Sequence, residues 1–247
     1  MKRLLSLCAL LGAMLVPLSA SAFVLGPTLP GKWGSPVMGT GATITWSLMP
    51  TGTSCAADGG GTCTSFADVM PSGWLAAVNS AFSAWSAVAN LTFLQVADDG
   101  AAFNAVTSSG DIRLGLHAFD GAGGTLAHGY FPPANGNSAS GDIHFDIGDL
   151  WKIGFGGPGF DLVQVLAHEI GHAIGLSHTG VPGSLMNPFY TEAFLGPQAD
   201  DIAGAQFIYG LPVVIQPVPE PGVLALFALA LLGLIYSRRR AALRDAD

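Results

Sequence analysis

HEIGHAIGLSH, residues 168–178, holds three of the six histidines in a chain of 247 residues, of which only 11% are charged. His168 and His172 are four positions apart, so on a helix both imidazoles project from one face. Glu169 follows the first histidine and lies roughly 100° further round the same turn. A third imidazole six residues after His172 cannot belong to the same continuous helix. The stretch therefore predicts a helix that ends inside it.

Gly175 and His178 complete the pattern. Glycine accepts the left-handed backbone that ends a helix and turns the chain, so His178 can approach the other imidazoles from the far side. Three neutral imidazoles with an open fourth position are typical of a catalytic zinc site. Zinc lowers the pKa of its bound water to about 7, and Glu169 can accept the proton and pass it to a leaving amine. The stretch thus predicts zinc-dependent peptide hydrolysis, with zinc held by His168, His172 and His178.

The full spacing H-E-x-x-H-x-x-G-x-x-H is the metzincin signature. The chain resembles the matrixins, the metzincin family of the matrix metalloproteinases, over about residues 40–210. Residues 184–188, Ser-Leu-Met-Asn-Pro, match the family's methionine turn, in which Met186 would form the base of the site. The next residues resemble the Pro-x-Tyr wall of the pocket that receives the side chain after the scissile bond. The resemblance thus implies Pro188 and Tyr190 as pocket residues.

A further resemblance concerns structural ions. In the matrixins, the histidines that match His128 and His144 bind a second, non-catalytic zinc. The matching aspartates and backbone oxygens hold a calcium, which prefers such oxygen ligands; they are Asp120, Gly121, Gly123, Thr125, Asp146 and Asp149. Asp111 and Asp142 correspond to a second calcium position.

The zinc part of this region departs from the family pattern. The family supplies two more ligands, His-x-Asp, starting seven residues before the aspartate that matches Asp120, but this chain has Arg113 there. His117 is the only nearby imidazole, and it lacks an aspartate two positions on. Two outcomes are open: His117 swings in as a third ligand, which leaves a three-histidine site with water, or it is an ordinary loop histidine.

Apolar periodicity predicts the strands and helices. Alternating, β-branched segments predict five strands, at 41–48, 91–96, 111–116, 125–131 and 142–146. Apolar residues three and four apart predict a helix from Pro71 through Val88, and later helices follow at 160–176 and 198–209. This order indicates an α+β fold. The resemblance implies a metzincin, zincin-type catalytic domain with a small, mixed, twisted five-stranded sheet and three helices.

Both ends of the chain carry targeting patterns. A charged start, an apolar stretch and a small-residue site predict a signal peptide at 1–22, rather than a buried N-terminal helix. Residues 218–241 hold Pro-Glu-Pro, a short apolar helix and an arginine cluster. They resemble the PEP-CTERM sorting signal, which exosortases recognise and remove in Gram-negative bacteria. A C-terminal membrane anchor is the alternative, although the apolar stretch is shorter than the roughly 20 residues that span a bilayer.

These motifs divide the chain. Between the ends we expect an extended lead-in at 23–40, a protease domain at 41–211 and a linker at 212–217, with a tail at 242–247. The protein is expected to be exported to the cell envelope or the extracellular space, with a transient or permanent transmembrane helix at its C-terminus.

Charge and cysteine content indicate which partners and which cross-links to expect. The chain has 9 basic and 17 acidic residues, a net charge of −8, which argues against nucleic acid as a partner. Cys55 and Cys63 are the only cysteines after the signal peptide, and an oxidising compartment would close them into a disulfide, interpreted here as a surface staple. A metal-binding thiol pair is the alternative. No cysteine occurs in 23–40, so control by a propeptide cysteine is not expected.

The preferred function is an exported zinc endopeptidase that cleaves protein or peptide substrates through a zinc-bound water activated by Glu169, with export and exosortase-type machinery as partners. A non-catalytic matrix or adhesion module is the first alternative, since such sorting tags often mark surface proteins. The intact Glu169 argues against it, because a degenerate module would have lost the base or a ligand. A zinc hydrolase acting on something other than protein is the second alternative.

Overall fold

The computed structural model describes residues 23–133, 139–213 and 223–244. The chain forms two compact units, residues 1–212 and 213–247, and the expected protease domain at 41–211 lies within the first. The expected signal peptide at 1–22, the Pro-Glu-Pro motif within 214–222 and the last three residues lie outside the described part.

Five strands form one mixed sheet, as the sequence predicted, in the order β3-β2-β4-β6-β5. Only β5 runs antiparallel to its neighbour. β4 lies in the middle and is buried along its whole length, whereas β5 forms an edge. The strands are β2 (Ala42–Leu48), β3 (Leu91–Gln95), β4 (Ile112–His117), β5 (Ala127–Gly129) and β6 (Ile143–Asp146).

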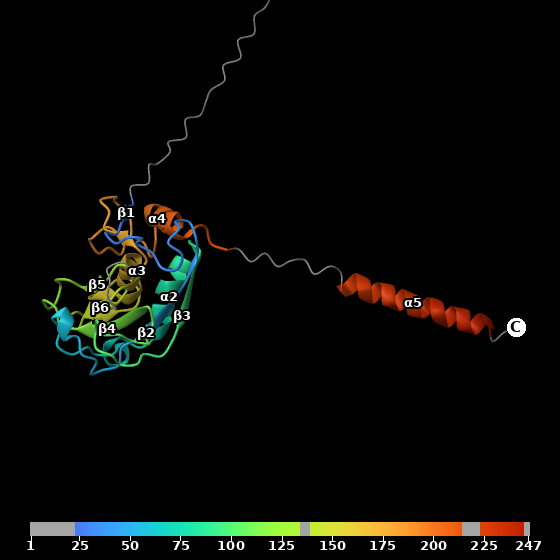
Figure 1. Ribbon diagram of the computed structural model, residues 1–247, viewed down its shortest axis with the longest axis horizontal. Coiled ribbons are helices and arrows are strands. Elements are labelled where there is room, and N and C mark those ends of the chain that lie inside the picture. Colours follow the sequence, from blue (N-terminus) through green and yellow to red (C-terminus); the bar gives the residue numbers. More distant parts are fainter. Residues whose placement is uncertain (1–22, 134–138, 214–222, 245–247) are drawn as a thin grey trace, which may run out of the picture. The chain divides into compact units, whose positions relative to one another are not determined.

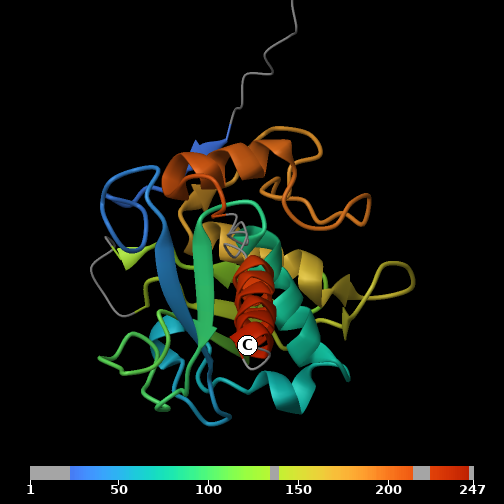
Figure 2. The same cartoon turned by 90° about the vertical axis from the view of Figure 1, so that its right-hand side faces the viewer.

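Two long helices, α2 and α3, pack together against this sheet (Figures 1 and 2). The rings of Trp46 on β2 and Phe82 on α2 stack with centroids 4.9 Å apart. The indole N–H of Trp85 joins the two helices, because it donates to the Ala167 carbonyl at 2.8 Å. The helices of this unit are η1 (Ala56–Asp58), α1 (Phe66–Val69), α2 (Trp74–Ser86), α3 (Leu162–Ala173) and α4 (Ala199–Tyr209).

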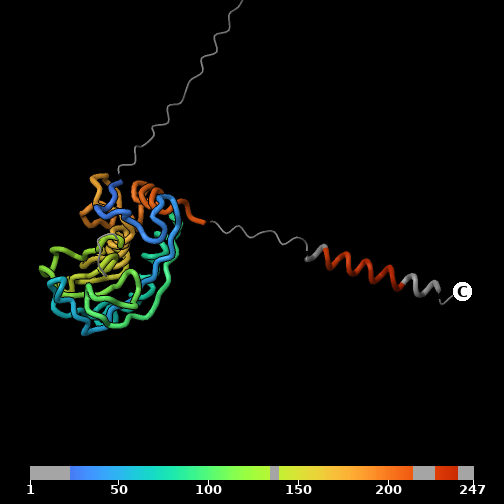
Figure 3. The backbone as a smooth tube through the Cα atoms, in the orientation of Figure 1, coloured from blue at the N-terminus to red at the C-terminus, as the bar shows by residue number. Residues whose placement is uncertain are grey.

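The lead-in before the sheet is more structured than the extended segment that the sequence suggested. β1 (Val24–Leu25) pairs antiparallel with β9 (Leu176–Ser177), directly after α3. The indole N–H of Trp33 donates to the Ala173 carbonyl at 2.7 Å, and its backbone N–H donates to the hydroxyl of Tyr209 on α4 at 3.1 Å. Figure 3 shows this blue segment running beside the orange α4. The lead-in therefore holds the end of α3 in place.

Two short parallel strands, β7 (Trp151–Lys152) and β8 (Phe160–Asp161), precede α3. The helix expected at 160–176 is shorter at both ends, since α3 covers only Leu162–Ala173. Its expected first two residues form β8, and its expected last residue belongs to β9.

The second unit contains α5 (Val223–Arg244), 22 residues long. Within residues 23–133, 139–213 and 223–244, no helix combines the length and the apolar character needed to cross a membrane. The structure therefore does not support the transmembrane helix that the sequence suggested.

Candidate active site

Helix α3 has a capped start, and it ends inside the histidine stretch, as the spacing of the histidines predicts. At its start the Asp161 carboxylate accepts a hydrogen bond from the backbone N–H of Gln164 at 2.8 Å, which caps the helix. At its end Gly175 has a φ of 108°, which residues with a Cβ rarely adopt. A Cβ there would lie 2.2 Å from the Gly31 carbonyl oxygen. The chain therefore leaves the helix at this glycine, and β9 leads it back to His178.

The three signature imidazoles converge. Nε2 of His178 lies 3.1 Å from Nε2 of His168 and 3.1 Å from Nε2 of His172. On His168 and His172, Nδ1 must be the donor, because its partners are the carbonyls of Leu185 (2.7 Å) and Leu176 (2.8 Å). Their Nε2 lone pairs therefore face His178. Tetrahedral bonds of about 2.05 Å to zinc place ligand nitrogens about 3.3 Å apart, so the three rings fit this cation.

Burial keeps these imidazoles neutral. It lowers the pKa of His168 to about 4 and the pKa of His172 to about 3, and it also lowers the pKa of His178. At pH 7 each ring therefore offers a lone pair. Metal binding requires this neutral form, so no proton has to be displaced.

Glu169 lies beside the imidazoles. Its side chain is only 6% exposed, and its Oε2 has no hydrogen-bond partner within the described residues. Burial raises the pKa of Glu169 to about 8, although a hydrogen bond from the Gly129 backbone opposes this shift. A dication at the adjacent imidazoles would favour the carboxylate. Such a group can exchange a proton near neutral pH, as a general base must.

A cleft of about 440 Å³ opens above these groups, and it contains both pocket residues that the family resemblance implies, Pro188 and Tyr190. The Tyr190 hydroxyl accepts from the backbone N–H of Asp161 (2.8 Å) and donates to Glu192 (2.7 Å), which fixes the ring. The lining residues are 123–127, Phe160, Gln164, Val165, His168, Glu169, His178, Leu185 and 187–191.

Met186, which the methionine-turn resemblance places at the base of the site, is buried against α3. A Cβ on Gly171 of α3 would lie 2.3 Å from the Met186 sulfur, so helix and turn meet only because this residue is glycine. The turn is held by Asp201, whose carboxylate accepts from the backbone N–H groups of Leu185 (2.7 Å) and Met186 (3.0 Å) and from the hydroxyl of Ser184.

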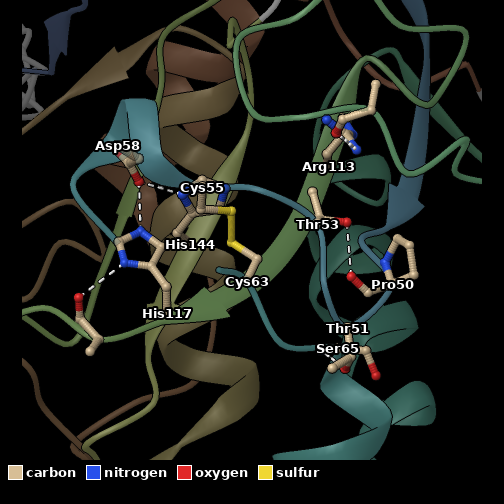
Figure 4. The surroundings of a disulfide bond; sticks show 12 residues. Pro50, Thr51, Thr53, Cys55, Asp58, Cys63, Ser65, Arg113, His117 and His144 are labelled. Carbon is tan, nitrogen blue, oxygen red and sulfur yellow. Dashed lines mark hydrogen bonds and ion pairs between the residues drawn. A yellow bond between two sulfur atoms is a disulfide. The ribbon is translucent and has the colours of Figure 1, made fainter. Parts of the chain in front are cut away.

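The other three histidines also meet. His117 ends β4, His128 lies on β5 and His144 lies on β6, and their ring nitrogens surround one oxygen of Asp58 at 2.7, 2.9 and 2.5 Å. The structure thus places His117 with the other two, as in the first of the two expected outcomes. Figure 4 shows Asp58 entering from the Cys55–Cys63 loop.

Asp58 is the site residue that the sequence analysis missed. The sequence contains one signal, the run Asp58-Gly-Gly-Gly between the two cysteines, to which the sequence analysis assigned no role. Both cysteines are fully buried, so the disulfide that the structure contains is not a surface staple. Arg113, at the position of the missing ligand, instead forms a buried ion pair with Asp98 at 2.8 Å.

Part of the expected calcium set comes together. Carboxylates of Asp146 and Asp149 accept from the backbone N–H groups of Gly121 (3.0 Å) and Gly123 (2.7 Å), while Asp120 accepts hydrogen bonds within its own loop. One buried oxygen of Asp149 has no hydrogen-bond partner within the described residues. Burial, followed by the charges of Asp146 and Asp120, raises the pKa of Asp149. This donor chemistry suits calcium, and the calcium site stays a prediction.

Asp111 and Asp142, the expected second calcium position, lie in different surroundings. The exposed Asp111 carboxylate accepts from the backbone N–H (2.8 Å) and the hydroxyl (2.7 Å) of Thr45. Asp142 is fully buried, accepts from the Arg113 backbone N–H at 3.1 Å, and burial raises its pKa well above the usual range. A second calcium here also stays a prediction.

Comparison with known proteins supplies independent evidence. Residues 64–210 match the family model of the matrixins, and residues 217–240 match that of the PEP-CTERM protein-sorting motif. Stromelysin-3 of Xenopus laevis is 42% identical over 147 residues, which cover 59% of this chain and 30% of that protein. Karilysin of Tannerella forsythia is 38% identical over 148 residues, covering 57% of this chain and 29% of karilysin. Matrix metalloproteinase-16 of Homo sapiens is 40% identical over 158 residues, covering 59% of this chain and 25% of that protein. The chain thus spans about 30% or less of the length of these three relatives.

Proposed function

The chain belongs to the matrixin family, and from this premise we propose that it is an exported, zinc-dependent endopeptidase. The observation that carries the proposal is the convergence of three imidazole Nε2 atoms beside the buried Glu169 at one open cleft. His168, His172 and His178 would hold the zinc. The names of relatives such as stromelysin-3 and matrix metalloproteinase-16 agree with this activity.

Each step of peptide hydrolysis has a residue suited to it. Zinc, when bound, supplies a Lewis acid that polarises the scissile carbonyl and acidifies water. Glu169 takes the proton of the attacking water and returns it to the leaving amine. The cleft below Pro188 and Tyr190 receives the side chain that follows the scissile bond. The edge of β5 can pair with an extended substrate, because no strand among the described residues covers its outer side.

Two structural ions belong to the proposal. A second zinc would bind at His128 and His144 together with His117, and a calcium would bind at the loop of Asp120, Asp146 and Asp149. Both ions would brace the segments that lead into the cleft-lining residues 123–127. A second calcium would bind at Asp111 and Asp142.

Export completes the proposal. The PEP-CTERM match at 217–240 supports sorting to the cell envelope by an exosortase, which would process the C-terminal segment. Fractionation of producing cells tests this: we expect the catalytic unit in the envelope or the medium, and its retention in the cytoplasm would contradict export.

Peptide cleavage tests the enzymatic part. The protein purified after export, supplied with zinc and calcium, is incubated with a mixed peptide library beside a Glu169→Ala variant and a chelated sample. We expect cuts by the wild type alone, and their positions define the pocket preference. A wild type that retains zinc but cuts nothing would favour the non-catalytic matrix or adhesion module.

A further inference from the structure

We propose that Asp58 is the fourth ligand of the second zinc site, and that the Cys55–Cys63 disulfide presents it, so that this site forms only after the disulfide has closed. The inference rests on the second zinc of the proposed function but not on catalysis. It extends the expected three-histidine site by a ligand that comes from a different part of the chain.

The hydrogen-bonding geometry calls for a cation. Nδ1 of His117 lies 3.1 Å from the carbonyl oxygen of Ala118, which can only accept, so the proton of a neutral His117 is on Nδ1. Nε2 of His117 then points a lone pair at an Asp58 oxygen 2.7 Å away. Two acceptors at this distance repel each other unless a cation, either a proton or a metal ion, lies against both. A histidine that donates its other nitrogen to a carbonyl is the usual arrangement of a metal ligand.

The four side chains make a closed ligand set. One candidate ligand atom from each of Asp58, His117, His128 and His144 lies within 4.8 Å of the others. Asp58, His117 and His144 are at most 6% exposed, whereas His128 is 34% exposed. Three imidazoles and one carboxylate are ligands that zinc accepts in tetrahedral geometry, and four protein ligands leave no open position. Such a site is structural rather than catalytic.

The disulfide fixes the position of Asp58. Asp58 is the last residue of η1 in the loop that Cys55 and Cys63 close with Cα atoms 5.5 Å apart. Its backbone N–H donates to the Cys55 carbonyl at 2.9 Å, so carboxylate and disulfide belong to one rigid turn. The disulfide packs under the sheet, where a Cβ on Gly115 of β4 would lie 3.4 Å from the Cys63 sulfur. Gly115 is the register partner of His144.

The glycines after Asp58 explain how the loop reaches the histidines. Gly59 ends η1 with a φ of 81°. A Cβ on Gly60 would lie 2.0 Å from Nδ1 of His117, so only glycine lets the loop lie against this ring. Gly59 and Gly60 therefore let the carboxylate approach the imidazoles.

The site is linked to the cleft through β5. His128 on β5 pairs in register with His144 on β6, and the next residue, Gly129, packs on α3. A Cβ on Gly129 would lie 2.8 Å from the Glu169 carbonyl oxygen. A metal at His128 therefore holds the strand that lies against the general base.

Without the disulfide, the position of Asp58 beside the histidines is no longer fixed. The loop then carries Asp58 on a glycine-rich segment, and ordering it adds an entropic cost to zinc binding. The free thiols would also compete for the metal, because the sulfur atoms lie within 4.8 Å of a His144 ligand atom. Zinc binding at this site is thus coupled to oxidation of the chain, which follows export.

Zinc titration of the protein purified after export tests the inference. The measured quantities are zinc bound per chain in competition with a chelator, and the thermal unfolding midpoint. We expect two zinc ions for the wild type and one for Asp58→Asn, with affinity at the second site at least about 10–100-fold weaker. The matched control is Asp68→Asn, since Asp68 is an exposed carboxylate on α1, and it should bind two.

The double variant Cys55→Ser/Cys63→Ser isolates the disulfide without creating thiols, and we expect its second site to weaken as much as in Asp58→Asn. An Asp58→Asn protein that binds two zinc ions with wild-type affinity overturns the ligand assignment. A double variant with an intact second site overturns the coupling, and if it does not fold, Asp58→Asn still decides the ligand. His178→Ala separates the proposals, because it removes the catalytic zinc alone.

Discussion

Replacing Gly175 by alanine should loosen both the fold and the catalytic zinc site. The φ of 108° at this position is strained for any residue with a Cβ, at about 1–3 kcal/mol. The new Cβ would also lie 2.2 Å from a backbone oxygen, that of Gly31, and overpacking of this kind costs about 1–3 kcal/mol. The two effects together predict a loss of about 2–6 kcal/mol in the free energy of unfolding.

Two neighbouring glycines provide matched controls. Gly183→Ala meets a φ of 77° with no atom within 4 Å of the new Cβ, so strain alone should cost about 1–2 kcal/mol. Gly180→Ala has open space and no such φ, so the change should stay within about 0.5 kcal/mol. Denaturant unfolding measures all three variants. A loss of 1 kcal/mol lowers the melting temperature by about 2–4 °C in a domain of this size.

Zinc affinity should fall most in Gly175→Ala, because the turn at Gly175 returns His178 to the site. The reasoning would be refuted if Gly175→Ala unfolded at the same denaturant concentration as Gly180→Ala, or if it kept wild-type zinc affinity despite its lower stability.

Three more substitutions probe the supports of the site. Gly171→Ala places a Cβ 2.3 Å from the Met186 sulfur and should cost about 1–3 kcal/mol in denaturant unfolding; wild-type stability would disprove the tight contact. Asp98→Asn leaves the buried Arg113 without its charge partner and should cost about 3–5 kcal/mol at pH 7. Burial raises the pKa of Asp98, but hydrogen bonds from Arg113 and Ser47 outweigh it and lower this pKa overall. The stabilisation by the Asp98 carboxylate is therefore fully present above about pH 4 and is lost as pH falls further. Below this pH the difference in unfolding free energy between Asp98→Asn and wild type should narrow. Asp201→Asn weakens the charged acceptor of the methionine turn and should cost about 1.5–3 kcal/mol, measured by thermal unfolding; an unchanged midpoint would contradict this role.

The fold could be predicted where local sequence patterns reflect the burial of apolar side chains, which stabilises the domain. The five strands and three main helices were predictable, because alternation and helical spacing reflect burial on one face. The convergence of His168, His172 and His178 was predictable because these residues lie within eleven positions, and one helix with one turn brings them together. The boundaries of α3 were less exact, since β8 and β9 are strands of only two residues that their pairing defines, β8 with the nearby β7 and β9 with the distant β1.

The cluster of Asp58 with three histidines shows why the remainder could not be predicted. Asp58 is 59 residues from His117 and 86 from His144, so no local spacing connects them. The family pattern directed attention to positions before Asp120, where this chain has Arg113 paired with Asp98. Only the tertiary arrangement of the disulfide loop against β4 brings Asp58 to the histidines.

The most direct test of the central claim is the comparison of wild type with Glu169→Gln in one experiment that measures bound zinc and peptide cleavage. Glutamine keeps the shape of the side chain but cannot accept the proton. We predict that Glu169→Gln retains the catalytic zinc and loses activity by a factor of about 10²–10⁴. Cleavage at the wild-type rate by the zinc-loaded variant, or the absence of zinc from the wild type, would contradict the account.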